Sequence, residues 1–127
     1  MLRIGSHLVR ADNSGVKLMK CIRIPGGSFQ KVAGLGQLIR VSIKRLDRSK
    51  KKVQKKKIYN AVIVGVKYKT RRKDGTFVKF DKNRALILSD QNKFMGTRVY
   101  GPLCKEIRGG IKEVKYRKII AYSKGTV

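Results

Sequence analysis

Short apolar runs separated by turn residues are the main pattern along this chain. Three such runs follow one another in the centre, at residues 61–66, 76–80 and 85–88. They are rich in β-branched and aromatic residues, which is typical of strands on a pleated, half-buried surface. The connections between them are cationic, and Asp74-Gly75 in the first connection favours a tight turn. The central segment therefore predicts three core strands that carry basic loops.

The first half of the chain predicts further strands, at residues 7–10, 16–24 and 39–44. In the second of these we expect one shared face, interrupted by Lys20, made by Val16, Leu18, Ile22 and Ile24. The third alternates strictly, with Ile39, Val41 and Ile43 on one face and Arg40, Ser42 and Lys44 on the other. Alternation with a period of two indicates a strand with one wet face. Because that wet face is cationic, it faces either solvent or phosphate.

The most basic stretch of the sequence is residues 44–57. A run this basic does not fold alone, and predicted strands flank it, so we expect the tip of a long hairpin. Contact with RNA is the favoured role of this tip, and a solvated loop is the alternative. A second basic turn, residues 67–73, contains Tyr68, which either stacks on an unpaired base or covers the end of the core.

After residue 89 the pattern changes from strands to loops and short helices. Pro102 suits the first turn of a helix, Leu103 and Ile107 lie one turn apart on it, and Gly109-Gly110 ends it. A second short helix is predicted over residues 114–122, with a strand as the alternative.

A single domain is expected, because the chain has 127 residues and shows neither an internal repeat nor a linker. The fold class is mostly β. Residues 1–89 are expected to form a β-barrel with a basic ribbon near 44–58, and residues 90–127 a loop and short helices.

The charge of the chain limits the kinds of partner that it can bind. There are 33 Lys and Arg against 7 Asp and Glu, for a formal charge of +26. Charge of this density repels itself in a compact state unless a polyanion neutralises it. The partner is therefore nucleic acid, an anionic membrane or an acidic protein, of which nucleic acid is favoured. The apolar fraction of 41% argues against a wholly disordered basic tail.

The residues that catalysis or metal binding requires are not gathered in any motif. His7 is the only histidine, and no nucleophile or carboxylate is tied to it. Cys21 and Cys104 are far apart, which favours small buried thiols over a zinc site. Most acids stand in turn sequences, where Asp bonds its own backbone. We expect no enzyme, cofactor or metal; a metal-dependent nuclease using Asp74 and Asp81 is the enzymatic alternative.

No apolar run approaches the length of about 20 residues that crosses a bilayer, so no membrane partner is expected. The N-terminus resembles neither a signal peptide nor a transit segment. We therefore expect the protein to work in the compartment where it is made.

Basic residues in the two predicted loops are the candidates for contact with RNA phosphates. They are Lys44, Arg45, Arg48, Lys50, Lys51, Lys52, Lys55, Lys56, Lys57, Arg71, Arg72 and Lys73.

Several motifs occur in one order along the chain. The central one reads Ala61-Val62-Ile63-Val64, nine residues, Asp74-Gly75, then Phe80, Asn83 and Leu86-Ile87. The others are Ala11-Asp12-Asn13-Ser14-Gly15; Gly26-Gly27-Ser28 with Ala33-Gly34-Leu35-Gly36; and Gly96-Thr97-Arg98-Val99-Tyr100-Gly101-Pro102 followed by Glu106-Ile107-Arg108. Together they resemble the family of large-subunit ribosomal protein number fourteen over essentially the whole chain. Leu86 replaces the valine of the family pattern.

The resemblance implies a five-stranded β-barrel, a projecting β-ribbon and a C-terminal pair of short helices. It implies a structural role in translation, with binding to large-subunit rRNA and a place on the subunit interface. There the family contributes to an intersubunit bridge with small-subunit rRNA, beside ribosomal proteins three and nineteen. It also implies docking of the ribosome silencing factor, at positions that match Thr97, Arg98 and Lys118.

Two features depart from the usual family pattern. Residues 50–57 are more basic than the family's ribbon, and the chain is rich in Lys, Ile, Asn and Tyr, as A+T-rich genes produce. A mitochondrial, organelle-encoded protein is the favoured origin, with the bacterial cytoplasm as the alternative. The alternative function, from a different functional class, is that of a free-standing RNA-binding regulator with a similar barrel.

Overall fold

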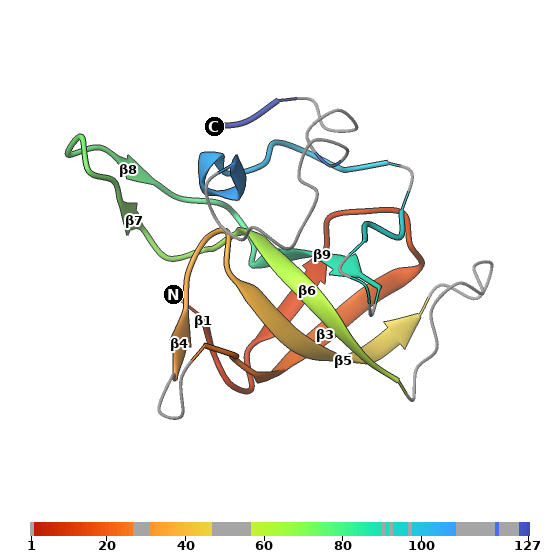
Figure 1. Cartoon of the computed structure of the whole chain (residues 1–127). Helices are drawn as coiled ribbons and strands as arrows, with labels where there is room; N and C mark the ends of the chain where they lie inside the picture. The colour runs from red at the N-terminus through yellow and green to blue at the C-terminus, as the bar shows by residue number, and fades with distance from the viewer. Residues whose placement is uncertain are drawn as a thin grey trace.

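Five strands close into a barrel at the centre of the molecule (Figure 1). The computed structural model describes residues 2–26, 31–46, 57–89, 91, 93–96, 98–108, 119 and 125–127. The barrel strands are β2 (His7–Arg10), β3 (Val16–Arg23), β5 (Leu38–Leu46), β6 (Ile58–Gly65) and β9 (Arg84–Leu88). Consecutive strands pair antiparallel, and the parallel pairing of β2 with β9 closes the ring. The expectation of a mostly β fold with a five-stranded barrel is confirmed.

Beside the barrel, the described residues also form two small sheets and a 3₁₀ turn. One sheet joins β1 (Leu2–Arg3) to β4 (Val32–Ala33), and the other joins β7 (Thr70–Arg71) to β8 (Phe77–Val78). The helical turn is a 3₁₀ helix, η1 (Lys105–Arg108). Within the described residues, no helix is long and apolar enough to cross a membrane.

The strands differ in how many of their faces are buried. In β5 the residues Ile39, Val41 and Ile43 are buried while Arg40 and Lys44 are exposed, so the predicted alternation is confirmed. In β6, by contrast, every residue from 61 to 65 is buried. The sequence of a strand that is covered on both faces is a continuous apolar run. The outer side of the barrel is therefore wet at β5 and covered at β6.

The predicted inward face of β3 is wrong. Met19 and Cys21 are buried together with Val16 and Ile24, whereas Leu18 and Ile22 are only half-buried. The pairing of β3 with β5 shifts register three times between Val16 and Arg23. An extra residue at a bulge moves the following side chains to the opposite face, which breaks a strict period of two.

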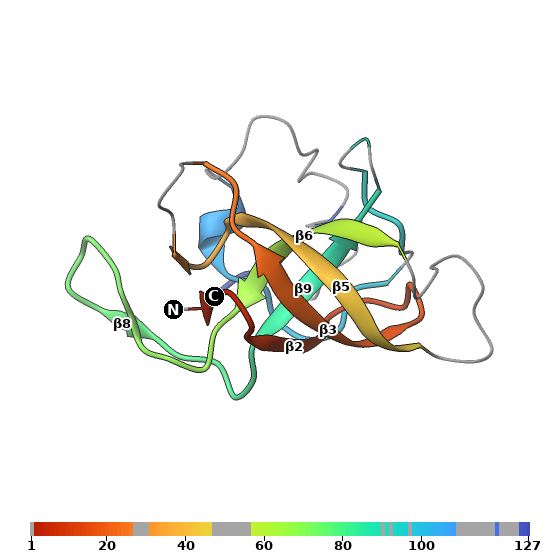
Figure 2. The same ribbon diagram turned by 90° about the horizontal axis from the view of Figure 1, so that it is seen from below.

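The run 76–80 is not a core strand, contrary to the prediction. Only Phe80 is buried, and Phe77 is 61% exposed. The run pairs instead with β7 in a two-stranded hairpin that projects from the barrel (Figures 1 and 2). The Asp74-Gly75 turn is confirmed: Gly75 has φ +87° and its N–H donates to the Arg72 carbonyl at 3.1 Å.

The helix predicted from Pro102 forms only in part, as the 3₁₀ turn η1. Leu103 forms a bridge with Thr126, and its backbone exchanges hydrogen bonds with Gly125 and Val127. The Leu103 carbonyl, which would accept from Ile107 in an α-helix, accepts from Val127 instead, and the helical turn described here in the chain begins at Lys105. Leu103 and Ile107 are nevertheless both buried. Of the second predicted helix, at 114–122, the structure describes Ile119, which is helical and buried.

The long hairpin predicted at 44–57 is described at its two ends. β5 continues through Leu46, so Lys44 and Arg45 belong to a strand and not to a loop. β5 and β6 pair from Leu38↔Val62 to Ser42↔Ile58, as a hairpin requires. Residues 47–56, which include the expected tip, lie outside the described residues.

Candidate nucleic-acid interface

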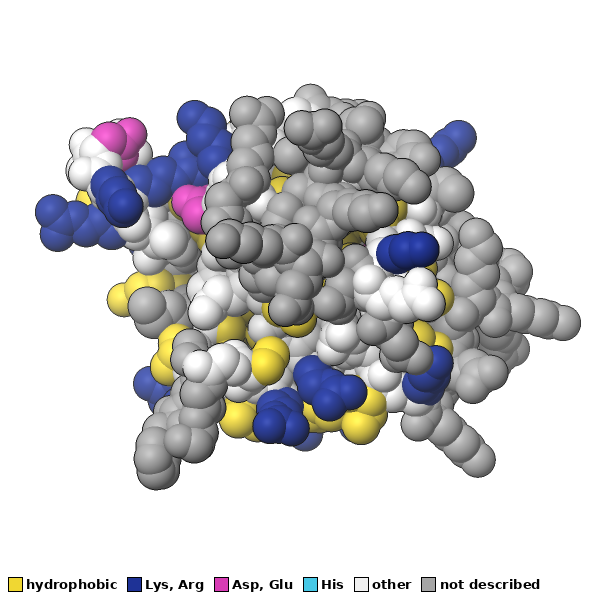
Figure 3. Space-filling view, viewed as in Figure 1, with side chains coloured by type: hydrophobic (Ala, Val, Ile, Leu, Met, Phe, Trp, Pro, Cys, Tyr) yellow, Lys and Arg dark blue, Asp and Glu magenta, His cyan; other side chains and the backbone are white. Residues whose placement is uncertain are grey.

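The wet outer side of β3 and β5 carries a group of exposed cations. We call Lys17, Arg23, Arg40, Lys44 and Arg45 the outer cationic face; all five are exposed. Register places them in two groups: Arg23 lies directly opposite Arg40, whereas Lys17, Lys44 and Arg45 lie at the other end of the β3–β5 pairing, where Leu18 is opposite Arg45. Dark blue side chains are visible along the lower side of the barrel in Figure 3.

The Arg23–Arg40 pair is unfavourable in the free protein. Side chains directly opposite in an antiparallel pair have Cβ atoms about 5 Å apart, and like charges there are destabilising. Within the described residues neither guanidinium has a carboxylate partner, since the one ion pair found there joins Arg72 to Glu106. A polyanion bound over this face would remove the repulsion.

A second cationic surface is the projecting hairpin, residues 67–80 with β7 and β8. It carries six cations, Lys67, Lys69, Arg71, Arg72, Lys73 and Lys79, against one carboxylate, Asp74. Figure 3 shows blue side chains along this hairpin and the acidic group near its end. Asp74 accepts hydrogen bonds from the Thr76 hydroxyl at 2.6 Å and from its N–H at 3.0 Å, which lower the pKa of the Asp74 carboxyl.

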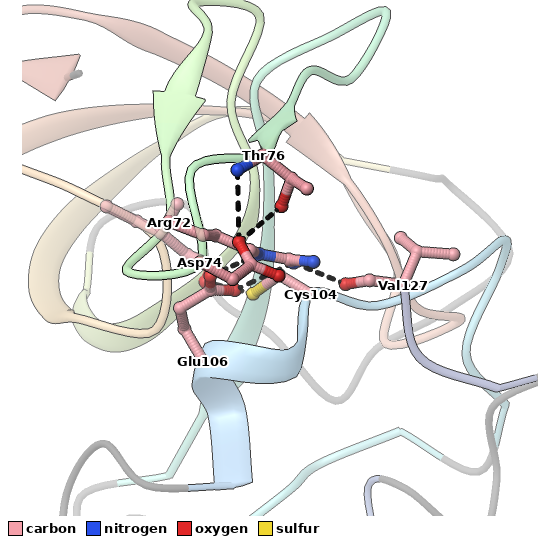
Figure 4. A network of polar contacts seen from close by, with 7 residues as sticks. Arg72, Asp74, Thr76, Cys104, Glu106 and Val127 are labelled. Carbon is pink, nitrogen blue, oxygen red and sulfur yellow. Dashed lines mark hydrogen bonds and ion pairs between the residues drawn. The ribbon is translucent and has the colours of Figure 1, made fainter.

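Arg72 fastens the hairpin to the C-terminal segment (Figure 4). Its Nε donates to Glu106 Oε1 at 3.0 Å, and its Nη2 donates to Glu106 Oε2 at 3.4 Å and to the main-chain oxygen of Val127 at 2.5 Å. Only 20% of the Arg72 side chain is exposed. Arg72 therefore positions the hairpin and, unlike Arg71 and Lys73, has most of its donors in use.

Glu106 is itself placed by a glycine turn. Gly36 has φ +79°, and a Cβ there would lie 2.8 Å from the Glu106 carbonyl oxygen. The Gly36 N–H donates to the Ile63 carbonyl of β6 at 2.8 Å. Only glycine allows the turn, the barrel and η1 to approach so closely.

Asp12 links three parts of the chain at the other end of the barrel. Its carboxylate accepts from the Ser14 N–H at 3.2 Å, from the Ser14 hydroxyl at 2.7 Å and from the Ile87 N–H of β9 at 3.2 Å. Asp12 also bridges to Val99. Burial raises the pKa of the Asp12 carboxyl, and the hydrogen bonds from Ser14 and Ile87 partly offset that effect.

This linkage holds the segment that we call the 93–102 loop. The Arg98 N–H donates to Asn13 Oδ1 at 3.0 Å, and the Tyr100 N–H donates to the Ala11 carbonyl at 2.7 Å. Gly96 lies so close to Asn13 that a Cβ at position 96 would be 2.9 Å from Asn13 Oδ1. As a result Arg98 is exposed on an anchored backbone.

Arg84 holds the far end of the 93–102 loop. Its guanidinium donates to the carbonyls of Tyr100 and Pro102. Tyr100 stays 44% exposed, with the Arg10 guanidinium 5.8 Å from its ring centre. Tyr100 of the loop and Arg10 of β2 thus lie side by side.

The sequence-predicted contact residues fall into three groups. Lys44, Arg45, Lys57, Arg71 and Lys73 are exposed, and Arg72 is engaged within the molecule. Tyr68 is 69% exposed and does not cover the core. Predicted contacts outside the described residues are Arg48, Lys50, Lys51, Lys52, Lys55, Lys56, Thr97 and Lys118.

Three cations of the outer cationic face, Lys17, Arg23 and Arg40, were absent from the predicted contacts. The alternation around Arg40 was the available signal. The proximity of Arg23 to Arg40 depends on register, which the bulges of β3 obscure in the sequence.

Metal-binding groups do not converge in the part of the chain that the structure describes, where no three His, Cys, Asp or Glu side chains could share an ion. Both cysteines are buried, as predicted. Burial, and next the Glu106 carboxylate, raise the pKa of the Cys104 thiol to about 12. Burial also raises the pKa of the Cys21 thiol.

We expect neither thiol to react rapidly with a disulfide reagent in the folded protein at pH 8, because the attacking species is the thiolate. Unfolding in guanidinium should expose both groups. Absorbance from a thiol–disulfide reagent measures this directly. Rapid labelling of Cys104 in the native state would contradict the burial described here.

A comparison with protein families identifies the chain. A family model described as ribosomal protein L14p/L23e matches residues 1–127. The chain belongs to this family. L14p/L23e proteins are structural constituents of the large ribosomal subunit and act in translation. The motifs that suggested the resemblance meet in space, since residues 11–15 hold the 93–102 loop and Gly36 packs on Glu106.

Proposed function

We propose that this chain binds large-subunit rRNA through the outer cationic face and the hairpin, and that the 93–102 loop faces the small subunit. Family membership supports the ribosomal setting. The main observation in favour of RNA contact is the exposed Arg23–Arg40 pair. The two positive charges repel each other, and a bound polyanion would relieve that repulsion.

The mechanism is electrostatic. Each Lys or Arg that contacts a phosphate releases condensed counterions, so the affinity falls steeply with salt and depends little on base sequence. The closed barrel acts as a rigid platform that keeps the cations at fixed spacing. Arginines can hold a phosphate with two parallel hydrogen bonds, whereas lysines act as point charges. The basic residues 48–57 add to the positive charge that attracts the phosphates.

Sedimentation distinguishes the proposal from a free-standing RNA-binding regulator. A subunit constituent migrates with large subunits in one-to-one amount and stays bound in high salt, because its many phosphate contacts leave a high affinity even after salt has lowered it. A regulator dissociates, because its few exposed phosphate contacts weaken with ionic strength. Loss of the protein from subunits at high salt would favour the regulator.

The 93–102 loop is our candidate for the subunit interface. There it would contribute to a bridge with small-subunit rRNA and lie near ribosomal proteins three and nineteen. In ribosomes that have a silencing factor, Thr97, Arg98 and Lys118 would receive it. The anchoring of Arg98 through Asn13 supports this role, since a fixed backbone lowers the entropy lost on binding.

Replacing Thr97 and Arg98 together by alanine is expected to weaken binding of the silencing factor by at least about tenfold, the loss of one charged contact. The barrel should stay folded, because the Arg98 side chain is exposed. Pull-down with the factor measures the effect. Arg71→Ala, on the hairpin, is the control with the same charge loss; equal binding by both variants would contradict the assignment.

Placement in mitochondria remains a prediction that rests on amino-acid composition. Localisation of a tagged chain, or translation in isolated organelles, would separate it from the bacterial cytoplasm.

A further inference from the structure

One face of the hairpin packs against the core, and the other is exposed. Thr70 lies opposite Val78, and Val78 packs against the hydrophobic core. Arg71 lies opposite Phe77, and both are exposed. Because side chains alternate between faces along a strand, Arg71 and Phe77 share the face that points away from the body.

Phe77 is unusual on that outward face. Its side chain is 61% exposed, although it stands in a hairpin whose other residues are mostly charged. Lys69 is two residues from Arg71, and Lys79 is two residues from Phe77. Both lysines are exposed. The face is therefore an aromatic ring among three cations, counting Arg71. The one acid of the hairpin, Asp74, is engaged by Thr76.

The hairpin is also held in place before any ligand binds. Arg72 ties it to Glu106 and Val127. At its base, the Lys67 N–H donates to Asn83 Oδ1 at 2.9 Å and the Phe80 N–H donates to the Val66 carbonyl at 3.0 Å. The ring of Phe77 is thus presented on a backbone fixed at several points.

We propose that Phe77 is a stacking platform for one unpaired base of RNA, with Arg71 and the neighbouring lysines holding the adjoining phosphates. This subsite rests on the proposed rRNA binding and specifies the kind of RNA involved. Bases within a duplex offer no free face to an aromatic ring, whereas bases in loops and bulges do. A protein partner fits less well, because lysine is depleted at protein interfaces and two of the three cations beside Phe77 are lysines.

The test uses the full-length protein with a 12-nucleotide single-stranded RNA that contains 2-aminopurine, and with a 12-base-pair RNA duplex. Phe77→Ala should weaken single-strand binding by about 5- to 150-fold, the range for one stacked base. It should reduce the fluorescence change, to which Tyr68, the other exposed aromatic ring of the hairpin, still contributes, and leave both duplex affinity and the salt slope unchanged. Phe77→Tyr should retain stacking.

Ile4→Ala is the matched control, because Ile4 is another exposed apolar side chain, at 54%. It should bind both RNAs as the wild type does. Equal single-strand binding by wild type and Phe77→Ala overturns the subsite alone. Failure of the wild type to bind either RNA overturns the proposed function as well.

A photo-crosslinking amino acid at position 77 tests the same point in assembled large subunits. We expect the crosslink to form with rRNA. A crosslink to protein alone would replace the stacking platform by a protein contact and overturn the proposal.

Discussion

Replacing Arg23, Arg40 and Lys44 by glutamine should reduce the slope of log K against log salt for rRNA binding by about 3, one for each lost phosphate contact. The three side chains lie on the exposed outer side of adjacent strands, and Arg23 is directly opposite Arg40. Between 1 M and 0.1 M salt, each contact accounts for about one decade of affinity. Binding at 0.1 M salt should therefore fall by about two to three orders of magnitude.

The same variant should be more stable than the wild type when no RNA is present, because the opposed guanidinium groups are gone. Misfolding could explain a loss of affinity on its own. It could not explain a loss of affinity in a variant that is more stable than the wild type. The control is Arg3, Lys31 and Lys105 to glutamine, exposed positions off the proposed binding surfaces, with the same loss from the formal charge of +26. An equal slope change in both variants would show that net charge, and not this surface, drives binding.

Replacing Asp12 by alanine should lower the free energy of unfolding by about 3 kcal/mol, since buried donors left without an acceptor cost about 1–3 kcal/mol each. The Ile87 N–H and the buried Ser14 would lose their acceptor. Urea unfolding measures the loss. Asp81→Ala, at an exposed position, should change stability by at most about 0.5 kcal/mol. Equal stability of the two variants would contradict the role of Asp12.

Asp12→Asn adds a test through pH. Burial raises the pKa of the Asp12 carboxyl above 3.8, so the folded state binds this proton more tightly than the unfolded state. Stability from this group therefore rises as the pH falls through the folded pKa, and levels off below 3.8. The stability of the wild type relative to Asp12→Asn should rise over that window. A relative decrease on acidification would contradict the raised pKa.

Local sequence patterns predicted the elements well where the chain was regular. The alternation of Ile39, Val41 and Ile43 identified β5 and its wet face, and Asp74-Gly75 identified a turn. The same reasoning failed at β3, because bulges are not encoded in a simple period. It failed at residues 76–80 because pairing with β7, and not apolar content, decides where that run lies.

The candidate interface was less predictable than the barrel. Asp12 was expected to bond its own turn, and it does bond Ser14, but its bond to Ile87 spans 75 residues. Arg72 was a predicted RNA contact, yet Glu106, 34 residues away, engages it. Such pairs depend on tertiary approach. Charge composition alone correctly indicated a strongly basic surface but not its layout.

We expect rRNA to contact the outer cationic face and the hairpin. Ultraviolet crosslinking of purified large subunits, followed by mass spectrometry of RNA-linked peptides, measures these contacts in the assembled particle. RNA-linked residues should lie in 17–23, 40–46 and 67–80. RNA-linked peptides confined to the 93–102 loop, with none from these three segments, would contradict this expectation.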